Sequence, residues 1–406
     1  MRYFTFSSWR RVCAFTGAVL VVVALRAPCG AAQQDTADIR QVLDGRMLPD
    51  VEVRTFEHSE RLYPSAMVAR GRSVRAIPAA ARQLHDVRFD SNGRHYDLFD
   101  YLAQNRVAGL LVLKDGKIAF EDYELGYDAG SRWASFSMAK SVSSTLIGIA
   151  LQQGLIASLD DPIGKYVPAL RGSAYESVSL RNVLRMASGV RWDETYTDPN
   201  SDCRKLTDAQ LRHVPGASMA YMATLKTAAP QGTVWNYNSG EANIAGAVLE
   251  GATHKPLAEY LSETLWSRLG MESDATWWTE SPGGMGLSGV GLGATLRDYG
   301  RFGLFVQDDG VIDGKRLVPQ GWFQAASAPQ IIGGRVVDYG LLWWPVPTGD
   351  AIHAGAFEAE GIFGQRLYIH RKERLVIVVL SARPKPLSIS GVSDNDFFAA
   401  VARALR

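Results

Sequence analysis

The sequence of 406 residues predicts an α+β fold, in which one antiparallel sheet is flanked by helices and a helical subdomain is inserted into the middle of the chain. Strand patterns occur near residues 108–124 and again near 365–381, whereas the segments between them are mainly helical in pattern. The hydrophobic content of 47% is sufficient for a sizeable core. We therefore expect the sheet to be assembled from both ends of this region.

The composition excludes several classes of protein. The chain has 43 basic and 42 acidic residues, so there is neither a basic surplus for nucleic acid nor an acidic block typical of a disordered tail. We expect no nucleic-acid partner. No pair of histidines has metal-ligand spacing, so we expect no metal. We also expect no organic cofactor. The histidines are at positions 58, 85, 95, 213, 254, 353 and 370.

The first regular elements follow a long polar segment. Residues 33–95 have weak periodicity and predict an irregular lead-in. Two apolar or alternating runs follow, AGLLVLK at 108–114 and KIAFEDYE at 117–124. Asp115-Gly116 lies between them, and two strands joined by Asp-Gly predict a β-hairpin.

Helical patterns dominate the centre of the chain. A helix is expected from Ser137 to Gln153, ended by Gly154, with apolar residues along one face. The polar segment 190–235 predicts a helical and loop insertion, and the glycine-rich run 283–293 predicts a loop. Further helices are expected at 179–186, 242–250, 256–269, 295–306 and 395–405, and strands at 365–369 and 375–381.

The N-terminus has the layout of a secretory signal peptide. Arginines at positions 2, 10 and 11 precede an apolar run at 12–25, and Gly30-Ala31-Ala32 supplies small residues before Gln33. The run is shorter than the roughly 20 residues that span a bilayer. We expect residues 1–32 to be removed and the protein to be exported, periplasmic or secreted, with no membrane span after cleavage. An uncleaved anchor and a lipid on Cys29 are the alternatives.

One Ser-x-x-Lys motif, Ser137-Met138-Ala139-Lys140, begins the first long helix. Positions i and i+3 of a helix are neighbours, so the Lys140 amine can reach the Ser137 hydroxyl. A serine becomes a nucleophile when a base takes its proton, and a lysine is such a base only when neutral. Burial on an apolar helix can lower the lysine pKa as required. The alternative is that Ser137 merely caps the helix.

Two later segments add functional groups to this pair. Tyr237, in Trp235-Asn236-Tyr237-Asn238-Ser239-Gly240, precedes an apolar helix, and a tyrosine at such a junction can relay a proton. The segment 359–365 (AEGIFGQ) leads into a strand. Gly361 lets the backbone approach a substrate, and the amide of Ile362 is a suitable oxyanion donor. Tyr237 as a packed aromatic residue is the structural alternative.

In this order, the three segments resemble the serine β-lactamase and penicillin-binding-protein superfamily, whose signatures are Ser-x-x-Lys, Ser/Tyr-x-Asn and Lys-Thr-Gly. The likeness is to the branch with class C β-lactamases, esterases and 6-aminohexanoate-dimer hydrolases, and most to the last. It covers about residues 96–406, including Leu159-Asp160-Asp161-Pro162 and LRNVLRMASG at 180–189. The resemblance implies a β-lactamase/transpeptidase-like domain over 96–406.

The resemblance also implies roles for individual residues. Ser137 would be the nucleophile, Lys140 its base and Tyr237 the proton relay, with the amides of Ser137 and Ile362 forming the oxyanion hole. A small-molecule amide or ester would acylate Ser137, and water would release the acyl group. The residues expected to contact substrate are Tyr196, Asn238, Ser239 and Gly361. The oligomeric state stays open.

The sequence departs from the superfamily pattern at two positions. Ser239 stands where the second motif usually has asparagine, and Ala359 stands where the third often has lysine or histidine. A cation that would hold a substrate carboxylate is thus missing, unless His353 or Arg366 supplies it. We therefore expect simple esters or linear amides as substrates. The alternatives are a β-lactamase, a D-alanyl-D-alanine carboxypeptidase, and a non-catalytic periplasmic penicillin-binding-like protein.

The N-terminal pattern generates a direct prediction. Protein recovered from the envelope of an expressing cell should begin at or near Gln33, because the small residues 30–32 suit a signal peptidase. N-terminal sequencing of the purified chain measures this. A mature chain that begins at Met1 would contradict the prediction.

Overall fold

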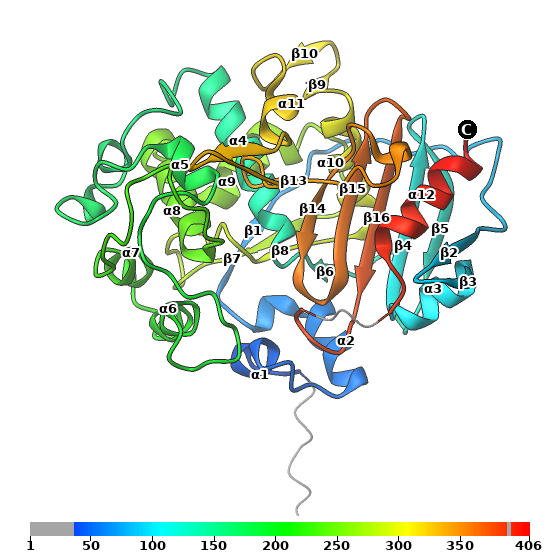
Figure 1. The fold of residues 1–406 in the computed structure, drawn as a ribbon, viewed down its shortest axis with the longest axis horizontal. Helices are drawn as coiled ribbons and strands as arrows, with labels where there is room; N and C mark the ends of the chain where they lie inside the picture. Colours follow the sequence, from blue (N-terminus) through cyan, green and yellow to red (C-terminus); the bar gives the residue numbers. More distant parts are fainter. Residues whose placement is uncertain (1–35, 388–390) are drawn as a thin grey trace, which may run out of the picture. The chain divides into compact units, whose positions relative to one another are not determined.

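The computed structural model describes residues 36–387 and 391–406. The predicted signal peptide, residues 1–32, and Cys29 within it lie outside the described residues. Within the described ranges no helix is long and apolar enough to cross a membrane. The helices and antiparallel sheets give the α+β architecture that the sequence predicts (Figure 1).

The central sheet joins a segment that precedes the helical subdomain to one that follows it. It has six strands, which lie in the order β13-β14-β15-β16-β4-β5 and pair antiparallel throughout. The strands are β4 (Val107–Lys114), β5 (Lys117–Tyr123), β13 (Trp344–Pro345), β14 (Phe357–Gly361), β15 (Gln365–His370) and β16 (Leu375–Ser381). β4 and β16 lie side by side in Figure 1 and pair from Leu375↔Lys114 to Ser381↔Val107. This confirms that distant segments build one sheet.

The hairpin between β4 and β5 forms as its turn sequence predicts. Asp115 and Gly116 both have positive φ, 52° and 74°, which a two-residue hairpin turn of this hand requires. Glycine adopts that conformation at no steric cost, and aspartate tolerates it better than most residues.

Each face of the sheet carries its own hydrophobic core. Along β4, Leu111 and Leu113 face the core that contains α10 (Leu296–Gln307), while Leu110 and Val112 face the core that contains α12 (Asp394–Ala404). This alternation follows from the two-residue period of a strand. The two helices therefore cover opposite faces.

Two glycines set how closely α10 approaches the sheet. A Cβ on Gly300 would lie 2.6 Å from a Leu111 methyl carbon, and one on Gly303 would lie 2.5 Å from a methyl carbon of Val376. Both distances are shorter than real contacts allow, so these positions need glycine for the helix to pack directly on the strands.

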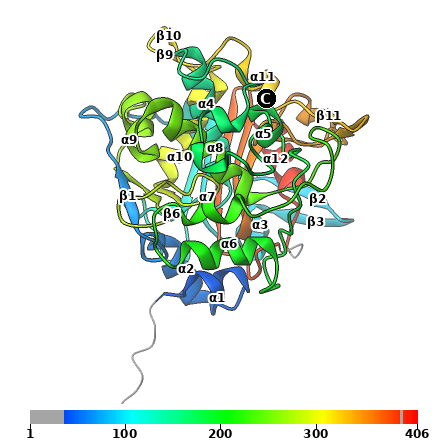
Figure 2. The same cartoon turned by 90° about the vertical axis from the view of Figure 1, so that its left-hand side faces the viewer.

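A helical subdomain fills the centre of the chain, as predicted (Figure 2). Its two long helices pack against each other and are largely buried. The polar insertion contains two helices and loops, in agreement with its pattern. The helices are α4 (Met138–Gln152), α5 (Leu180–Leu184), α6 (Asp202–Gln210), α7 (Ala217–Met222), α8 (Ser239–Thr253) and α9 (Leu257–Leu261).

The segment expected to be irregular, 33–95, contains regular structure from residue 39 onward. It forms α1 (Ile39–Leu43), α2 (Pro49–Glu57), β1 (Ser65–Val68), β2 (Arg88–Ser91) and the start of β3 (Arg94–Asp97). β1 pairs with β7 (Ala275–Trp278) in a second sheet of four strands. These elements are too short to give a clear period, and their buried residues are defined by distant partners. The expectation of an irregular lead-in was therefore wrong for this part.

Phe56 on α2 is the strongest link between this segment and the rest of the fold. Its buried ring lies 5.6 Å from Trp133 and 5.0 Å from both Phe136 and Phe363, between ring centroids. Phe136 and Phe363 come from two turns that are more than 200 residues apart in sequence. One side chain therefore fixes both turns.

This packing predicts the cost of removing Phe56. Phe56→Ala should lower the free energy of unfolding by about 3–5 kcal/mol, because a buried ring with three aromatic neighbours is replaced by a cavity. Urea unfolding followed by tryptophan fluorescence measures the change. Phe99→Ala is the matched control, since the Phe99 side chain is 76% exposed and its loss should change stability by no more than about 0.5 kcal/mol. Equal effects of the two substitutions would contradict the role of Phe56.

Candidate active site

The candidate nucleophile lies where a strained turn enters α4. Phe136 has a left-handed backbone, with φ at 44°, and its ring is held by Phe56 and Phe363. Ser137 follows at the N-cap position of α4, yet its side chain makes no capping hydrogen bond. Its hydroxyl instead accepts from the Lys140 amine, 2.8 Å away. The alternative role of Ser137 as a helix cap therefore has no geometric support.

Lys140 is buried among oxygen atoms. Its Nζ lies 2.8 Å from Ser137 Oγ, 2.8 Å from the carbonyl oxygen of Gly289 and 3.2 Å from Ser239 Oγ. The side chain is only 2% exposed. Burial lowers the pKa of Lys140 from 10.5 to about 8, and the negative charge of Glu194 partly opposes this shift. A substantial fraction of Lys140 is therefore neutral near physiological pH.

Tyr237 lies just before α8, and the Lys140 amine lies over its ring. Its ring stacks on Trp344 at 5.9 Å and meets Tyr339 edge-on at 6.0 Å, while Lys140 Nζ is 5.1 Å from the ring centre. Burial raises the pKa of Tyr237 well above its usual value, and the Glu194 charge adds to this, while a hydrogen bond with Ser137 opposes it. The phenol therefore carries its proton and can donate it.

The turn between β14 and β15 supplies the second backbone amide. A Cβ on Gly361 would lie 2.5 Å from the carbonyl oxygen of Ser135, so only glycine lets this turn pack against the nucleophile turn. Among the described residues, no acceptor is bonded to the backbone amide of Ser137 or of Ile362. Both residues line the same cavity. Both amides are therefore placed to donate to an oxygen atom in the cavity, and their role as an oxyanion hole stays a prediction.

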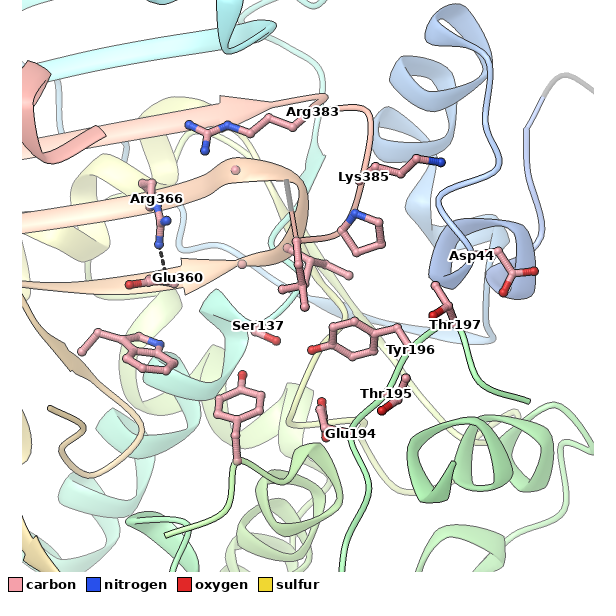
Figure 3. Close-up of a pocket in the computed structure, with 17 residues that line it drawn as sticks. Asp44, Ser137, Glu194, Thr195, Tyr196, Thr197, Glu360, Arg366, Arg383 and Lys385 are labelled. Carbon is pink, nitrogen blue, oxygen red and sulfur yellow. Dashed lines mark ion pairs between the residues drawn. The ribbon is translucent and has the colours of Figure 1, made fainter. Parts of the chain in front are cut away.

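The cavity in front of Ser137 has a volume of about 840 Å³ (Figure 3). Aromatic and apolar side chains line much of it, including Tyr196, Tyr237, Trp344 and Ile362. Charged side chains lie around it, and Figure 3 shows Glu194 and Lys385 on different sides. A cavity of this size accommodates a small organic substrate.

The structure brings together most of the predicted site residues. Tyr196 lines the cavity and is half-buried, and Gly361 lies at its edge. Ser239 lies deeper, against Lys140, where it contacts the base instead of the cavity.

Asn238 does not lie in the cavity, so its predicted contact with substrate was wrong. Its side chain is 1% exposed, caps α8 by accepting from the Glu241 amide, and donates to Glu241 and to the Tyr175 hydroxyl. An N-cap residue directs its side chain to its own helix, which turns Asn238 away from the substrate.

None of the three positions considered for a carboxylate-binding cation supplies one. Ala359 is buried in β14 opposite Leu367 and does not line the cavity. His353 is buried between the Tyr368 hydroxyl, 3.0 Å away, and the carbonyl oxygen of Asn395, 3.1 Å away. Arg366 lines the cavity, but its guanidinium pairs with Glu360 and with Asp394 at 3.1 Å.

Several charged residues of the cavity were not predicted from the sequence, among them Glu194 and Lys385. The Glu194 carboxylate accepts from the Ser239 hydroxyl, from the Ser239 amide at 2.9 Å and from the Trp192 indole at 2.5 Å. Lys385 follows β16 in a Pro-Lys-Pro sequence that has no catalytic pattern, and its amine donates to the carbonyl of Gly45 at 2.8 Å. The one available signal for Glu194 was its position two residues before Tyr196. Within the part of the chain that the structure describes, no three acidic, histidine or cysteine side chains are grouped to hold a metal.

Comparison with known proteins identifies the family. The beta-lactamase family model matches residues 97–394. The 6-aminohexanoate-dimer hydrolase of Paenarthrobacter ureafaciens is 30% identical over 308 residues, which cover 71% of this chain and 76% of that protein. The chain therefore belongs to the beta-lactamase family, and its predicted place in the serine β-lactamase and penicillin-binding-protein superfamily is confirmed. The relative that is 30% identical is a hydrolase by name.

Solved structures confirm the fold. A Bacillus anthracis protein named as a candidate 6-aminohexanoate-dimer hydrolase superposes with a TM-score of 0.78 at 23% identity, covering 91% of this chain and 98% of that one. A D-alanine carboxypeptidase from Burkholderia cenocepacia superposes with a TM-score of 0.52 at 18% identity, covering 75% and 95%. At these identities the likeness concerns the fold alone.

Proposed function

We propose that this protein hydrolyses a linear amide or an ester through an acyl-enzyme on Ser137. The observation that carries the proposal is the contact of 2.8 Å between Lys140 Nζ and Ser137 Oγ, in a buried setting that lowers the lysine pKa to about 8. A neutral amine at hydrogen-bond distance is a base for the serine proton. The same contact argues against a non-catalytic binding protein, which has no need of a buried amine against a hydroxyl.

The geometry supports a sequence of proton transfers. Lys140 takes the proton from Ser137 as Oγ attacks the substrate carbonyl carbon, and the carbonyl oxygen becomes an oxyanion facing the amides of Ser137 and Ile362. Tyr237 then donates its phenolic proton to the leaving nitrogen or oxygen and recovers a proton from Lys140. In the second half, neutral Lys140 takes a proton from water as the water oxygen attacks the acyl carbon. The bond between that carbon and Ser137 Oγ then breaks, and Lys140 returns the proton to Ser137 Oγ.

The charges around the cavity support neutral groups beside the scissile bond. The cations of Arg366 and Arg383 are paired with Asp394, and Arg366 also with Glu360. The carboxylate of Glu194 lies close to the base. A substrate with a carboxylate next to its scissile amide would meet this negative charge. Lys385, the cavity cation without an ion-pair partner among the described residues, lies on a different side of the cavity from Glu194 (Figure 3). This favours an ester or linear amide over a β-lactam or a D-alanyl peptide.

Labelling tests the assigned nucleophile and base. A fluorophosphonate should form one adduct, located on Ser137 by peptide mass spectrometry. Lys140→Arg should abolish labelling and turnover, because arginine keeps the charge but does not give up its proton in a protein. Lys165→Arg is the matched control, since Lys165 pairs with Asp161 on the surface and should behave as wild type. An adduct on another serine would overturn the assignment of the nucleophile.

Substrate preference is the second test. The missing charge-assisted contact is worth about 1.5–3 kcal/mol, which corresponds to roughly a ten- to hundredfold loss in kcat/KM. We therefore expect kcat/KM for nitrocefin to fall at least tenfold below that for a short-chain p-nitrophenyl ester. Steady-state kinetics on the same preparation measure both. A kcat/KM for nitrocefin near 10⁶ M⁻¹s⁻¹, within the ordinary enzyme range, would favour the β-lactamase alternative instead.

A further inference from the structure

The three oxygen atoms around Lys140 are not equivalent as hydrogen-bond partners. The carbonyl oxygen of Gly289, at 2.8 Å, can only accept. The hydroxyls of Ser137 and Ser239, at 2.8 and 3.2 Å, can in principle either donate or accept. The direction of these two bonds decides whether Lys140 can act as a base. It depends on where each hydroxyl sends its own proton.

The Ser239 proton is committed to Glu194. Ser239 Oγ donates to one carboxylate oxygen of Glu194, and its backbone amide, at the first residue of α8, donates to the other at 2.9 Å. The Trp192 indole also donates to Glu194, at 2.5 Å. Three donors thus surround the carboxylate at the start of α8, and an ionised carboxylate only accepts. Ser239 Oγ can therefore only accept from Lys140.

A neutral amine has two N–H bonds and one lone pair. Gly289 O and Ser239 Oγ take the two N–H bonds, so the lone pair is left to face the third neighbour, Ser137 Oγ. We infer that Glu194 is a positioning residue that, through the Ser239 hydroxyl, aims the lone pair of neutral Lys140 at the nucleophile. The inference rests on the proposed function, because it assigns a role within the same reaction. Without Glu194, the Ser239 hydroxyl could turn its proton toward Lys140 and compete with Ser137 for the lone pair.

Glu194 also acts on Lys140 through its charge. Three titratable side chains face the amine: Glu194 from the insertion, Tyr237 before α8 and Cys203 on α6. Burial raises the pKa of both Tyr237 and Cys203 well above their usual values, so both are neutral near pH 7. Glu194 is then the negative charge that opposes the lowering of the Lys140 pKa. Removal of that charge should lower the Lys140 pKa further.

The two effects of Glu194 can be separated by pH profiles. In the wild-type protein, kcat/KM for a p-nitrophenyl ester should rise with pH through about 8, as Lys140 loses its proton. Glu194→Gln should move this rise to lower pH and reduce the high-pH plateau about ten- to a hundredfold through lost alignment. Glu194→Asp keeps the charge but shortens the reach, so the rise should stay in place while the plateau falls. Ser239→Ala should behave as Glu194→Asp does.

Glu280→Gln is the matched control. Glu280 is a buried carboxylate that accepts from the backbone amides of Gly216 and Ser218, away from Lys140. Its removal should leave both the plateau and the pH of the rise unchanged. Circular dichroism confirms that each variant is folded, and Ser239→Ala tests the same link if Glu194→Gln does not fold.

The outcomes distinguish this inference from the proposed function. A wild-type plateau and profile in Glu194→Gln, with normal fluorophosphonate labelling of Ser137, would overturn the positioning role and leave the proposed function standing. A lower plateau in Glu194→Gln with the rise at its wild-type pH would overturn the electrostatic part and show a purely structural role. Absence of any label on Ser137 in the wild-type protein would overturn the proposed function itself.

Discussion

The interaction on which the site depends is the burial of one lysine amine against one serine hydroxyl. A buried ammonium is unfavourable unless its hydrogen bonds are satisfied, and burial lowers the pKa of Lys140 to about 8. The fold supplies three oxygen atoms for the amine, from α4, from α8 and from the loop before β8 (Leu292–Ala294). Each lies on a different part of the chain, so this environment of Lys140 exists only when the two helices and the loop have assembled.

Aromatic packing holds the backbone in the conformation that the site requires. Phe136 and Phe363 both have left-handed backbones, with φ at 44° and 64°, a conformation that is unfavourable for a bulky residue. Their rings contact each other at 5.4 Å, and Phe56 contacts both. The strain lies next to Ser137 on one side and next to Ile362 on the other. Core packing by the N-terminal segment thus stabilises the two turns whose amides form the candidate oxyanion hole.

The sequence predicts those parts of the site that depend on local spacing. Ser137 and Lys140 meet because they are three apart on a helix, and Tyr237 was identified because it precedes an apolar helix. Glu194 could not be found in this way, because its contact with Ser239 forms only when a polar segment folds over the start of a helix 45 residues later. The same reason explains why α1, α2 and β1 were not predicted. They are short, and their positions depend on distant partners such as Trp133 and β7. Features that depend on packing between distant segments could therefore not be predicted from local periodicity.

Charge pairing decides what the cavity can hold beside the reacting bond. Arg366, Arg383 and Asp44 line the cavity, yet each is paired with a neighbour: Arg366 and Arg383 with Asp394, and Asp44 with Arg204. Among the charged cavity residues that the structure describes, Glu194 and Lys385 have no ion-pair partner, and Figure 3 places them on different sides of Tyr196. Of these cavity residues, Glu194 is the one whose negative charge acts on Lys140. The aromatic wall of Tyr237 and Trp344 lies beside the Lys140 amine, and we propose that this arrangement suits a neutral acyl group better than a substrate carboxylate.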